Sequence, residues 1–469
     1  MSTPPPRLPL ASKLWYGVGY LPDSIMNNLF YALVFVVYQI ELGISGTIIG
    51  GAMMVSRLWE AFIDPFFGNL SDRTRSRWGR RRPYMVAGAI LGGLMCFALW
   101  SPPQEVSKEY QGWYFAIVAV LFYTAYAIYS VPFMALGLGM SSNDQDRTSL
   151  FGWRVAANNL VCCTLVPAAP LLVYNKWLGD TPLASLSNIG LIAGLMIIGS
   201  GILAAMKISE HESSQVAKGS ESHVGMIDGF RCVMKSAPFL MTTGIVSFTI
   251  IGMCAAGNLT LYLNLTHVYP GGTEVEKKLA TELSAITGTV SAVLGLVFAP
   301  LVSSISAKMG RRNMLLTAIF GIMAAFLLSP VFFSQTYPYL QLVFATMTNL
   351  CVTAVWVLTL PMLADACDYD EIQNGVRREG IFTAMYNWGI KVAVAMIGVM
   401  SGLVIDNSGF VATMAEQSES TKAILTWSFA LGPIPFFAAC AIMTWYFPLS
   451  AEKIQALRDE RASKAALTH

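Results

Sequence analysis

The stretch that decides the fold class runs from Leu186 to Met206 and reads LSNIGLIAGLMIIGSGILAAM. It holds 21 residues, none of them charged. A helix needs about 20 consecutive, mostly apolar residues to cross the hydrocarbon core of a bilayer. A helix on the surface of a soluble protein has a polar face, which this run lacks. The stretch therefore predicts a membrane-spanning helix.

The whole chain of 469 residues has the composition of a membrane protein. Apolar residues make up 55% and charged residues 12%, and the mean hydropathy is +0.55. A soluble protein carries about 25% charge and would need that polar surface to cover several domains. These values exclude a soluble enzyme, a disordered chain and a disulfide scaffold. The net charge of +2 gives no reason to expect a nucleic-acid partner.

Eleven further apolar stretches have comparable length. Each is too long for the strand of a membrane barrel, which has about 10 residues of alternating polarity. The twelve predicted spans are Leu14–Ile40, Thr47–Leu70, Tyr84–Ser101, Trp113–Met140, Ser149–Tyr174, Leu186–Met206, Phe239–Leu265, Leu283–Ile305, Met314–Phe333, Tyr337–Ala364, Ile381–Ile405 and Ala423–Phe447. We therefore expect an all-α integral membrane protein with twelve transmembrane helices.

Basic residues in the connections predict the orientation in the membrane. With both termini in the cytoplasm, the cytoplasmic connections hold 22 Lys and Arg residues and the outer connections hold 5. Cytoplasmic loops of membrane proteins carry such an excess. We expect a multi-pass protein of the cell (inner) membrane with both termini cytoplasmic. The remaining three basic residues, Arg57, Arg154 and Lys391, fall inside predicted spans.

The order of the spans suggests two halves. The longest polar connection falls between the sixth and seventh spans, and Gly-Arg-Arg recurs at Gly79 and Gly310, after the second span of each half. Such a repeat predicts two pseudo-symmetric six-helix bundles. We expect the chain to be a monomer in contact with membrane lipids. The predicted parts are an N-terminal bundle (1–207), a cytoplasmic linker (208–237), a C-terminal bundle (238–447) and a cytoplasmic tail (448–469).

The charged cytoplasmic loops allow two interpretations. They can serve membrane orientation alone, or they can pack against neighbouring helix ends as a cytoplasmic gate. The second interpretation makes gate residues of Asp72, Arg73, Arg80, Asp365, Asp368 and Arg377. Asp365 and Asp368, together with Asp370 and Glu371, could also mimic a metal cluster, but the neighbouring Arg377 and Arg378 favour salt bridges.

Three ionisable residues lie close together in the second predicted span. Arg57, Glu60 and Asp64 are three and four residues apart, so they share one helix face. A charge in the middle of a bilayer costs about 2.5–3.5 kcal/mol on insertion scales, so it needs a partner or a wet cavity. Two carboxylates beside a cation could bind Na⁺ or exchange a proton. The alternative is a purely structural ion-pair network.

Other polar and aromatic residues within the spans are candidates for binding a polyhydroxylated ligand. Carboxylate, amide and cationic groups can hydrogen-bond hydroxyls, and aromatic rings can stack on the apolar faces of a sugar. The candidates from this reasoning are Asp23, Asn27, Tyr126, Arg154, Trp356 and Lys391. For each, a structural role as an ion-pair or packing residue is the alternative.

Several motifs resemble one transporter family. The runs ADACDYDE (Ala364–Glu371), RLWEAFIDP (Arg57–Pro65), TRSRWG (Thr74–Gly79) and VPF (Val131–Phe133) are similar to motifs of the glycoside–pentoside–hexuronide:cation symporter family. This melibiose permease-like family belongs to the major facilitator superfamily. The resemblance implies the major facilitator fold and sugar uptake by alternating access, driven by H⁺ or Na⁺ without a further cofactor.

The resemblance also implies roles for single residues. Glu60 and Asp64 match the paired cation-site carboxylates of the family, and Asp23 falls near a substrate carboxylate. Arg154, Trp356 and Lys391 match positions at or beside the sugar and cation sites.

The chain departs from the family in the cation site and in the substrate site, where Met134 also stands in place of a Trp. Ile63 and Ala127 replace neutral oxygen ligands of the cation site, which favours H⁺ over Na⁺. Ser130 replaces a second substrate Asp, so galactoside specificity does not carry over, although we keep Ser130 as a substrate candidate.

Three other functions compete with sugar symport. A transporter of an amphiphile such as a lysolipid would need a more apolar cavity than Asp23 and Arg154 suggest. A membrane enzyme would need a catalytic His, Cys or metal cluster, and the sequence pattern gives none, so we expect no enzyme. A substrate sensor that no longer transports would have little need for the intramembrane charges.

Overall fold

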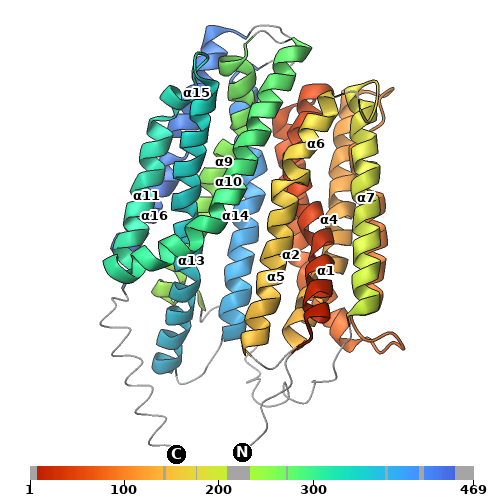
Figure 1. Cartoon of the computed structure of the whole chain (residues 1–469), viewed down its shortest axis with the longest axis vertical. Helices are drawn as coiled ribbons and strands as arrows, with labels where there is room; N and C mark the ends of the chain where they lie inside the picture. Colours follow the sequence, from red (N-terminus) through yellow and green to blue (C-terminus); the bar gives the residue numbers. More distant parts are fainter. Residues whose placement is uncertain are drawn as a thin grey trace, which may run out of the picture. The chain divides into compact units, whose positions relative to one another are not determined.

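The protein is described by a computed structural model over residues 8–140, 144–175, 177–208, 233–270, 273–374, 379–410 and 417–448. All regular elements in these ranges are helices (Figure 1). In chain order they are α1 (Leu10–Phe35), η1 (Val36–Glu41), α2 (Gly46–Arg73), α3 (Arg82–Trp100), α4 (Lys108–Gly139), α5 (Asp144–Cys163), α6 (Leu165–Tyr174), α7 (Pro182–Lys207), α9 (Ala237–Leu263), η3 (Asn264–Val268), α10 (Glu274–Met309), α11 (Arg311–Leu327), α12 (Ser329–Phe332), η4 (Pro338–Leu340), α13 (Gln341–Asn374), α14 (Glu379–Asn407), α15 (Glu419–Leu431) and α16 (Ile434–Trp445). Most of the predicted linker and nearly all of the predicted tail lie outside the described residues.

The helices occupy the positions of the twelve predicted spans. Nine helical stretches in the described ranges are long and apolar enough to cross a membrane. The other three predicted spans correspond to α2, α10 and α11, of which α11 has only 17 residues. Some spans are made of two pieces, because α1 continues as the π-helix η1 and α15 is followed closely by α16. The prediction of an all-α chain is confirmed.

The chain forms two compact units, which we describe separately. Unit 1 comprises residues 1–221, 269–292 and 398–417, and unit 2 comprises the remainder. Helix α14 therefore contributes its first part, up to Ile397, to unit 2 and its last part, from Gly398, to unit 1. The sequence-based boundaries at residues 207 and 238 stay a prediction.

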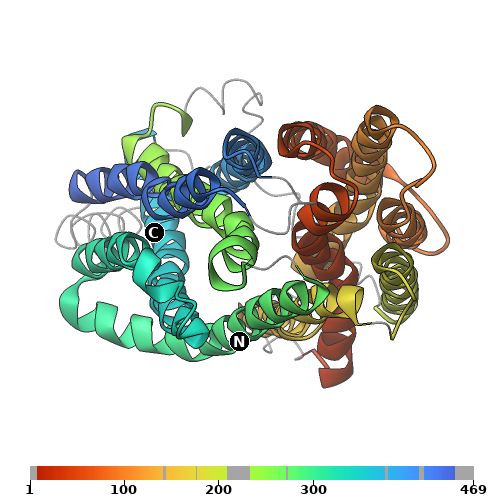
Figure 2. The same ribbon diagram turned by 90° about the horizontal axis from the view of Figure 1, so that it is seen from above.

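Close helix packing in unit 1 depends on small residues. Helix α3 packs along both α4 and α7, and α1 packs along α5 and α7 (Figure 2). A Cβ atom on Gly93 of α3 or on Gly194 of α7 would lie 2.6 Å from the carbonyl oxygen of the other glycine. Small residues bring helices together in this way within membranes, where no hydrophobic effect drives association.

Unit 2 is held by an aromatic core. Helices α9, α11, α13 and α16 pack against one another. The ring of Phe326 in α11 lies 5.3 Å from Phe344, 5.5 Å from Phe429 and 5.8 Å from Phe437, measured between ring centroids. Such aromatic pairs add to the packing energy of the core.

The two Gly-Arg-Arg loops have the same local backbone feature. Gly79 and Gly310 adopt positive φ angles of 102° and 81°, a conformation that suits glycine. Directly after the first loop, Arg82, the first residue of α3, donates to the carbonyl oxygen of Ile208, at the C-terminal end of α7. In the second, Arg312 donates to the carbonyl oxygen of Trp445, at the end of α16. Cations favour such helix ends, so both loops pack on helix termini of their own unit.

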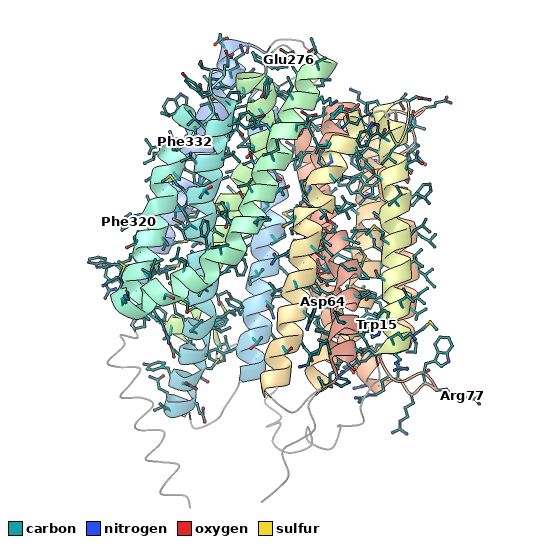
Figure 3. The ribbon with its side chains drawn as sticks, in the orientation of Figure 1. Trp15, Asp64, Arg77, Glu276, Phe320 and Phe332 are labelled. Carbon is teal, nitrogen blue, oxygen red and sulfur yellow. The ribbon has the colours of Figure 1, made fainter. Side chains whose placement is uncertain are left out.

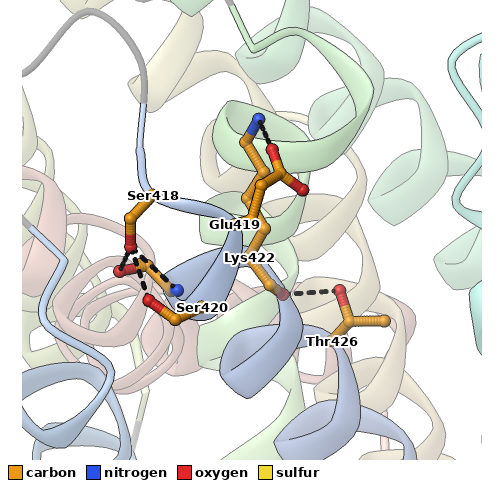
Figure 4. A network of polar contacts seen from close by, with 6 residues as sticks. Ser418, Glu419, Ser420, Lys422 and Thr426 are labelled. Atoms are coloured by element: carbon orange, nitrogen blue, oxygen red, sulfur yellow. Dashed lines mark hydrogen bonds and ion pairs between the residues drawn. The ribbon is translucent and has the colours of Figure 1, made fainter.

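Polar residues lie in the connections between helices and at the helix ends. Arg77 lies beyond the helix ends in the connection between α2 and α3 (Figure 3). At the start of α15, the Ser418 hydroxyl accepts a hydrogen bond from the Thr421 amide, and Glu419 pairs with Lys422 at 2.8 Å (Figure 4). The Ser418 cap satisfies one of the backbone amides that a helix terminus leaves unpaired.

Candidate functional site

Arg57 of α2 is the centre of a buried polar network in unit 1. Its side chain is only 6% exposed. It donates through Nη1 to Glu60 Oε2 at 2.8 Å, through Nε to the Tyr31 hydroxyl at 2.7 Å and through Nη2 to Asn27 Oδ1 at 2.5 Å. The guanidinium also lies 4.0 Å from the ring centroid of Tyr123. This set of partners stabilises a cation that the membrane interior would otherwise strongly disfavour.

The carboxylates of α2 follow from helix geometry. Glu60 lies one turn after Arg57 and is almost fully buried, so the two charges pair within a single helix. Asp64 lies one further turn along α2, is partly buried, and falls within the helical part of unit 1 (Figure 3). A buried ion pair contributes little net stability, because its attraction must offset the desolvation of both charges. The burial of the Arg57–Glu60 pair therefore suggests a functional role more than a structural one.

Asp23 of α1 is the centre of a neighbouring polar group. Asp23 is 5% exposed, and its carboxylate lies within interaction distance of Tyr20, Tyr126 and Arg154. Arg154 of α5 donates to the Tyr20 hydroxyl at 3.3 Å, with its guanidinium 4.6 Å from the Tyr20 ring centroid. Glu60 also interacts electrostatically with Asp23. Helices α1, α2, α4 and α5 thus bring together six predicted site residues: Asp23, Asn27, Arg57, Glu60, Tyr126 and Arg154.

A third polar group joins α1 to α5 beside these residues. The Asn158 Oδ1 atom accepts hydrogen bonds from Ser24 Oγ at 2.9 Å and from Asn28 Nδ2 at 3.2 Å. Asn28 also donates to the Ser24 carbonyl oxygen at 2.9 Å. None of these three residues is among the site residues predicted above, and Ser24 is the hardest of them to find in the sequence. Its one signal is that Ser24 stands four residues before Asn28, on the same helix face.

Two further α4 positions bear on the predicted site. Ser130 is 7% exposed and lies one turn after Tyr126 on α4. None of the residues that the structure describes forms a hydrogen bond with its hydroxyl. Ala127 is fully buried and offers no side-chain oxygen.

Trp356 and Lys391 belong to unit 2. Trp356 of α13 is 42% exposed, and Lys391 of α14 is partly buried. Because the other substrate candidates belong to unit 1, a site shared by all of them stays a prediction.

The gate residues have mixed outcomes. Asp365 of α13 is buried and pairs with Arg311 at 2.6 Å. The sequence analysis did not predict Arg311 as the partner of Asp365, although Arg311 stands in the repeated Gly-Arg-Arg motif. Arg73 and Arg80 are exposed and Asp368 is partly buried. The Asp72 side chain and Arg377 lie outside the described residues.

The described residues include no group of three or more His, Cys, Asp or Glu side chains placed to hold a metal ion. What they do offer is a set of paired charges and amides inside the helices. Such an arrangement can bind a small polar molecule and a monovalent cation.

The chain is similar in sequence to several transporters. The family described as MFS/sugar transport protein matches residues 15–451. The chain is 26% identical to the inner membrane symporter YicJ of Escherichia coli, over 97% of this chain and 95% of the relative. It is 24% identical to the isoprimeverose transporter of Lactiplantibacillus pentosus (96% and 91% covered) and 23% identical to the sodium-dependent lysophosphatidylcholine symporter 1 of Gallus gallus (98% and 92% covered).

The fold is similar to that of a solved transporter. The chain superimposes on the nucleoside transporter NupG with a TM-score of 0.63 at 14% identity, over 94% of this chain and 99% of NupG. The major facilitator fold expected from the sequence is therefore confirmed, as is the resemblance to the glycoside–pentoside–hexuronide:cation symporters. The chain is a multi-pass membrane transporter, not an enzyme, and it belongs to the MFS/sugar transport protein family.

Proposed function

We propose that this transporter carries a sugar or glycoside across the cell (inner) membrane together with a cation, by alternating access. Relatives named as a symporter and as an isoprimeverose transporter support this substrate class. With both termini in the cytoplasm, the connection between η1 and α2 faces outward.

The observation that carries the proposal is the position of Arg57 between two polar groups. Its guanidinium holds Glu60 with one nitrogen and Asn27 of α1 with another. Asn27 lies four residues after Asp23, so it belongs to the same face of α1. A change of charge at Glu60 therefore alters the bonding of a residue beside the proposed substrate site.

The substrate half of the site consists of Asp23, Arg154 and the Ser24–Asn28–Asn158 group. Buried carboxylate, guanidinium and amide groups discriminate strongly for ligands that satisfy their hydrogen bonds. Sugar hydroxyls both donate and accept hydrogen bonds, which matches this mixture of groups. Tyr126 would add an aromatic face, and Trp356 and Lys391 of unit 2 would complete the site.

The coupling half consists of Glu60 and Asp64. Arg57 already holds one oxygen of Glu60, and neither Ile63 nor Ala127 provides a neutral oxygen ligand. Na⁺, a hard cation, binds best where several oxygen ligands surround it. These features support H⁺ as the coupling ion, taken up by a carboxylate while the substrate is bound.

The lysolipid alternative rests on a relative whose name specifies lysophosphatidylcholine. An acyl chain would gain little from a site lined by Asp23, Arg154 and Asn158. The polar character of this group favours the sugar.

The test is uptake into proteoliposomes across a panel of neutral sugars, glycosides, hexuronides and lysophosphatidylcholine. A pH gradient and a Na⁺ gradient are imposed separately. We expect accumulation of one sugar or glycoside under the pH gradient, and its loss in Glu60→Gln and Asp64→Asn. Glu419→Gln, which removes an exposed carboxylate, is the matched control and should accumulate normally.

Each other outcome contradicts part of the proposal. Accumulation by both carboxylate variants would remove the coupling assignment. Accumulation of lysophosphatidylcholine alone would establish the alternative substrate, and ligand binding without uptake would indicate a sensor.

A further inference from the structure

The start of α2 is capped by a carboxylate from α14. Asp406 Oδ2 accepts hydrogen bonds from the Ser45 hydroxyl at 2.5 Å and the Thr47 amide at 2.8 Å, and Oδ1 accepts one from the Gly46 amide at 2.8 Å. Ser45 occupies the N-cap position but makes no capping bond with its own side chain. Asp406, 361 residues further along the chain, takes over that role.

Helix physics makes this contact specific. The first amides of a helix have no partner inside the helix, and the aligned peptide dipoles place a partial positive charge there. A carboxylate accepts hydrogen bonds from these amides and offsets the partial positive charge, and charge-assisted hydrogen bonds are stronger than neutral ones. Ser45, Thr47 and Asp406 are nevertheless exposed, so water can replace each partner when the contact opens.

Directly beneath the cap, α2 and α14 touch backbone to backbone. A Cβ atom on Gly50 would lie 2.1 Å from the carbonyl oxygen of Gly398, and one on Gly402 would lie 2.1 Å from that of Gly46. The two glycines of each helix are four residues apart, which is the spacing of closely packed membrane helices. Gly51, the next residue of α2, has nothing within 4 Å of the corresponding position and lies off this contact.

We propose that Asp406 and the paired glycines form an outer latch, which closes the transporter at the start of α2 and opens once in each transport cycle. Helix α14 makes this contact only with its last part, from Gly398, whereas its earlier part belongs to unit 2. A helix shared in this way can transmit a rearrangement of unit 2 to the start of α2. The contact also has the properties of a reversible closure: few bonds, an exposed rim, and glycine surfaces that separate without leaving bulky side chains unpacked.

The test measures access to the contact and needs no substrate, so it can fail independently of the proposed function. Met53 is 1% exposed, and its Cβ lies 2.9 Å from the Cβ position of Gly398. It is seven residues into the helix from Gly46, about 10 Å below the rim. A Met53→Cys variant without native cysteines is labelled with a membrane-impermeant maleimide, added outside to right-side-out vesicles.

Two variants open the latch by different routes. Asp406→Ala removes the cap, and Gly50→Ala places a methyl group against the Gly398 carbonyl oxygen. We expect each to raise the labelling rate about tenfold, because the latched state loses its specific contact and the two-state equilibrium shifts. If one variant fails to elute as a monodisperse protein, the other still tests the proposal.

The controls separate opening from general loosening. Gly51→Ala adds the same methyl group one residue away, in open space, and Glu419→Gln removes a carboxylate outside the latch. Both should label like the parent. Unchanged labelling in Asp406→Ala and Gly50→Ala would overturn the latch, and so would an equal rise in all four variants.

Discussion

Replacing Glu60 with Gln tests whether the Arg57–Glu60 pair is structural or functional. The variant keeps the size of the side chain but leaves the Arg57 guanidinium without its counter-ion. Removing one partner of a buried ion pair costs about 3–5 kcal/mol. Arg57 keeps its bonds to Tyr31 and Asn27 and its contact with the Tyr123 ring. We therefore expect the lower end, a loss of about 3 kcal/mol in the free energy of unfolding.

A second variant separates stability from transport. In Arg57→Met/Glu60→Gln, a side chain of similar volume replaces the cation, so no buried charge is left unpaired. Removing both charges of a buried pair avoids the cost of leaving one of them unpaired. We expect the double variant to recover most of the lost stability while it still fails to accumulate substrate.

The assay combines denaturant unfolding in detergent micelles with gradient-driven uptake in proteoliposomes. Glu419→Gln, whose carboxylate is exposed, is the control and should change neither measurement. A double variant that regains both stability and accumulation would show that the pair is purely structural. A Glu60→Gln protein as stable as the parent would refute the expected loss in the free energy of unfolding, which rests on the burial of the pair.

Three further predictions concern the rest of the molecule. Asn158→Ala should raise the KM for the transported sugar about tenfold with little change in kcat, because the proposed substrate site loses the hydrogen-bonding amide of Asn158. Uptake kinetics measure both constants. Gly194→Leu should destabilise the protein by about 1–3 kcal/mol, because the side chain would overlap the α3 backbone. Gly199→Leu, on the same helix but in open space, should have no such effect in thermal denaturation. Asp365→Asn should weaken the ion pair with Arg311 and so increase the labelling of cysteines introduced on the cytoplasmic side. Unchanged labelling would exclude a gate at this ion pair.

The helices were predictable from the sequence because the bilayer leaves so few choices. A run such as Leu186–Met206 must form a helix, since the hydrocarbon core provides no other partner for its backbone amides. The Arg57–Glu60 pair was predictable for a similarly local reason, because residues three apart on a helix are neighbours. Both inferences need only the spacing along one segment.

Contacts between distant segments were beyond the same reasoning. The partners of Asn158 in α1 stand 130 and 134 residues earlier, and periodicity along α5 cannot indicate them. Asp406 was placed in a loop, because the predicted span ends at Ile405 and a carboxylate is a natural boundary for an apolar run. Its capping partners at the start of α2 appear only when the helices are assembled.

The hydrogen bonds of Arg57 and those of Asp406 are broken by different events, and this difference supports separate roles for the two residues. Arg57 is buried among four partners, so neither water nor a small movement can replace Glu60 at low cost. Only a change of charge on its partner alters its bonding substantially, which suits a residue that senses the coupling ion. Asp406 is exposed, and water can take the place of the Ser45 hydroxyl and the Thr47 amide, which are exposed as well. A movement of α14 can therefore break its bonds without any titration, which suits a latch.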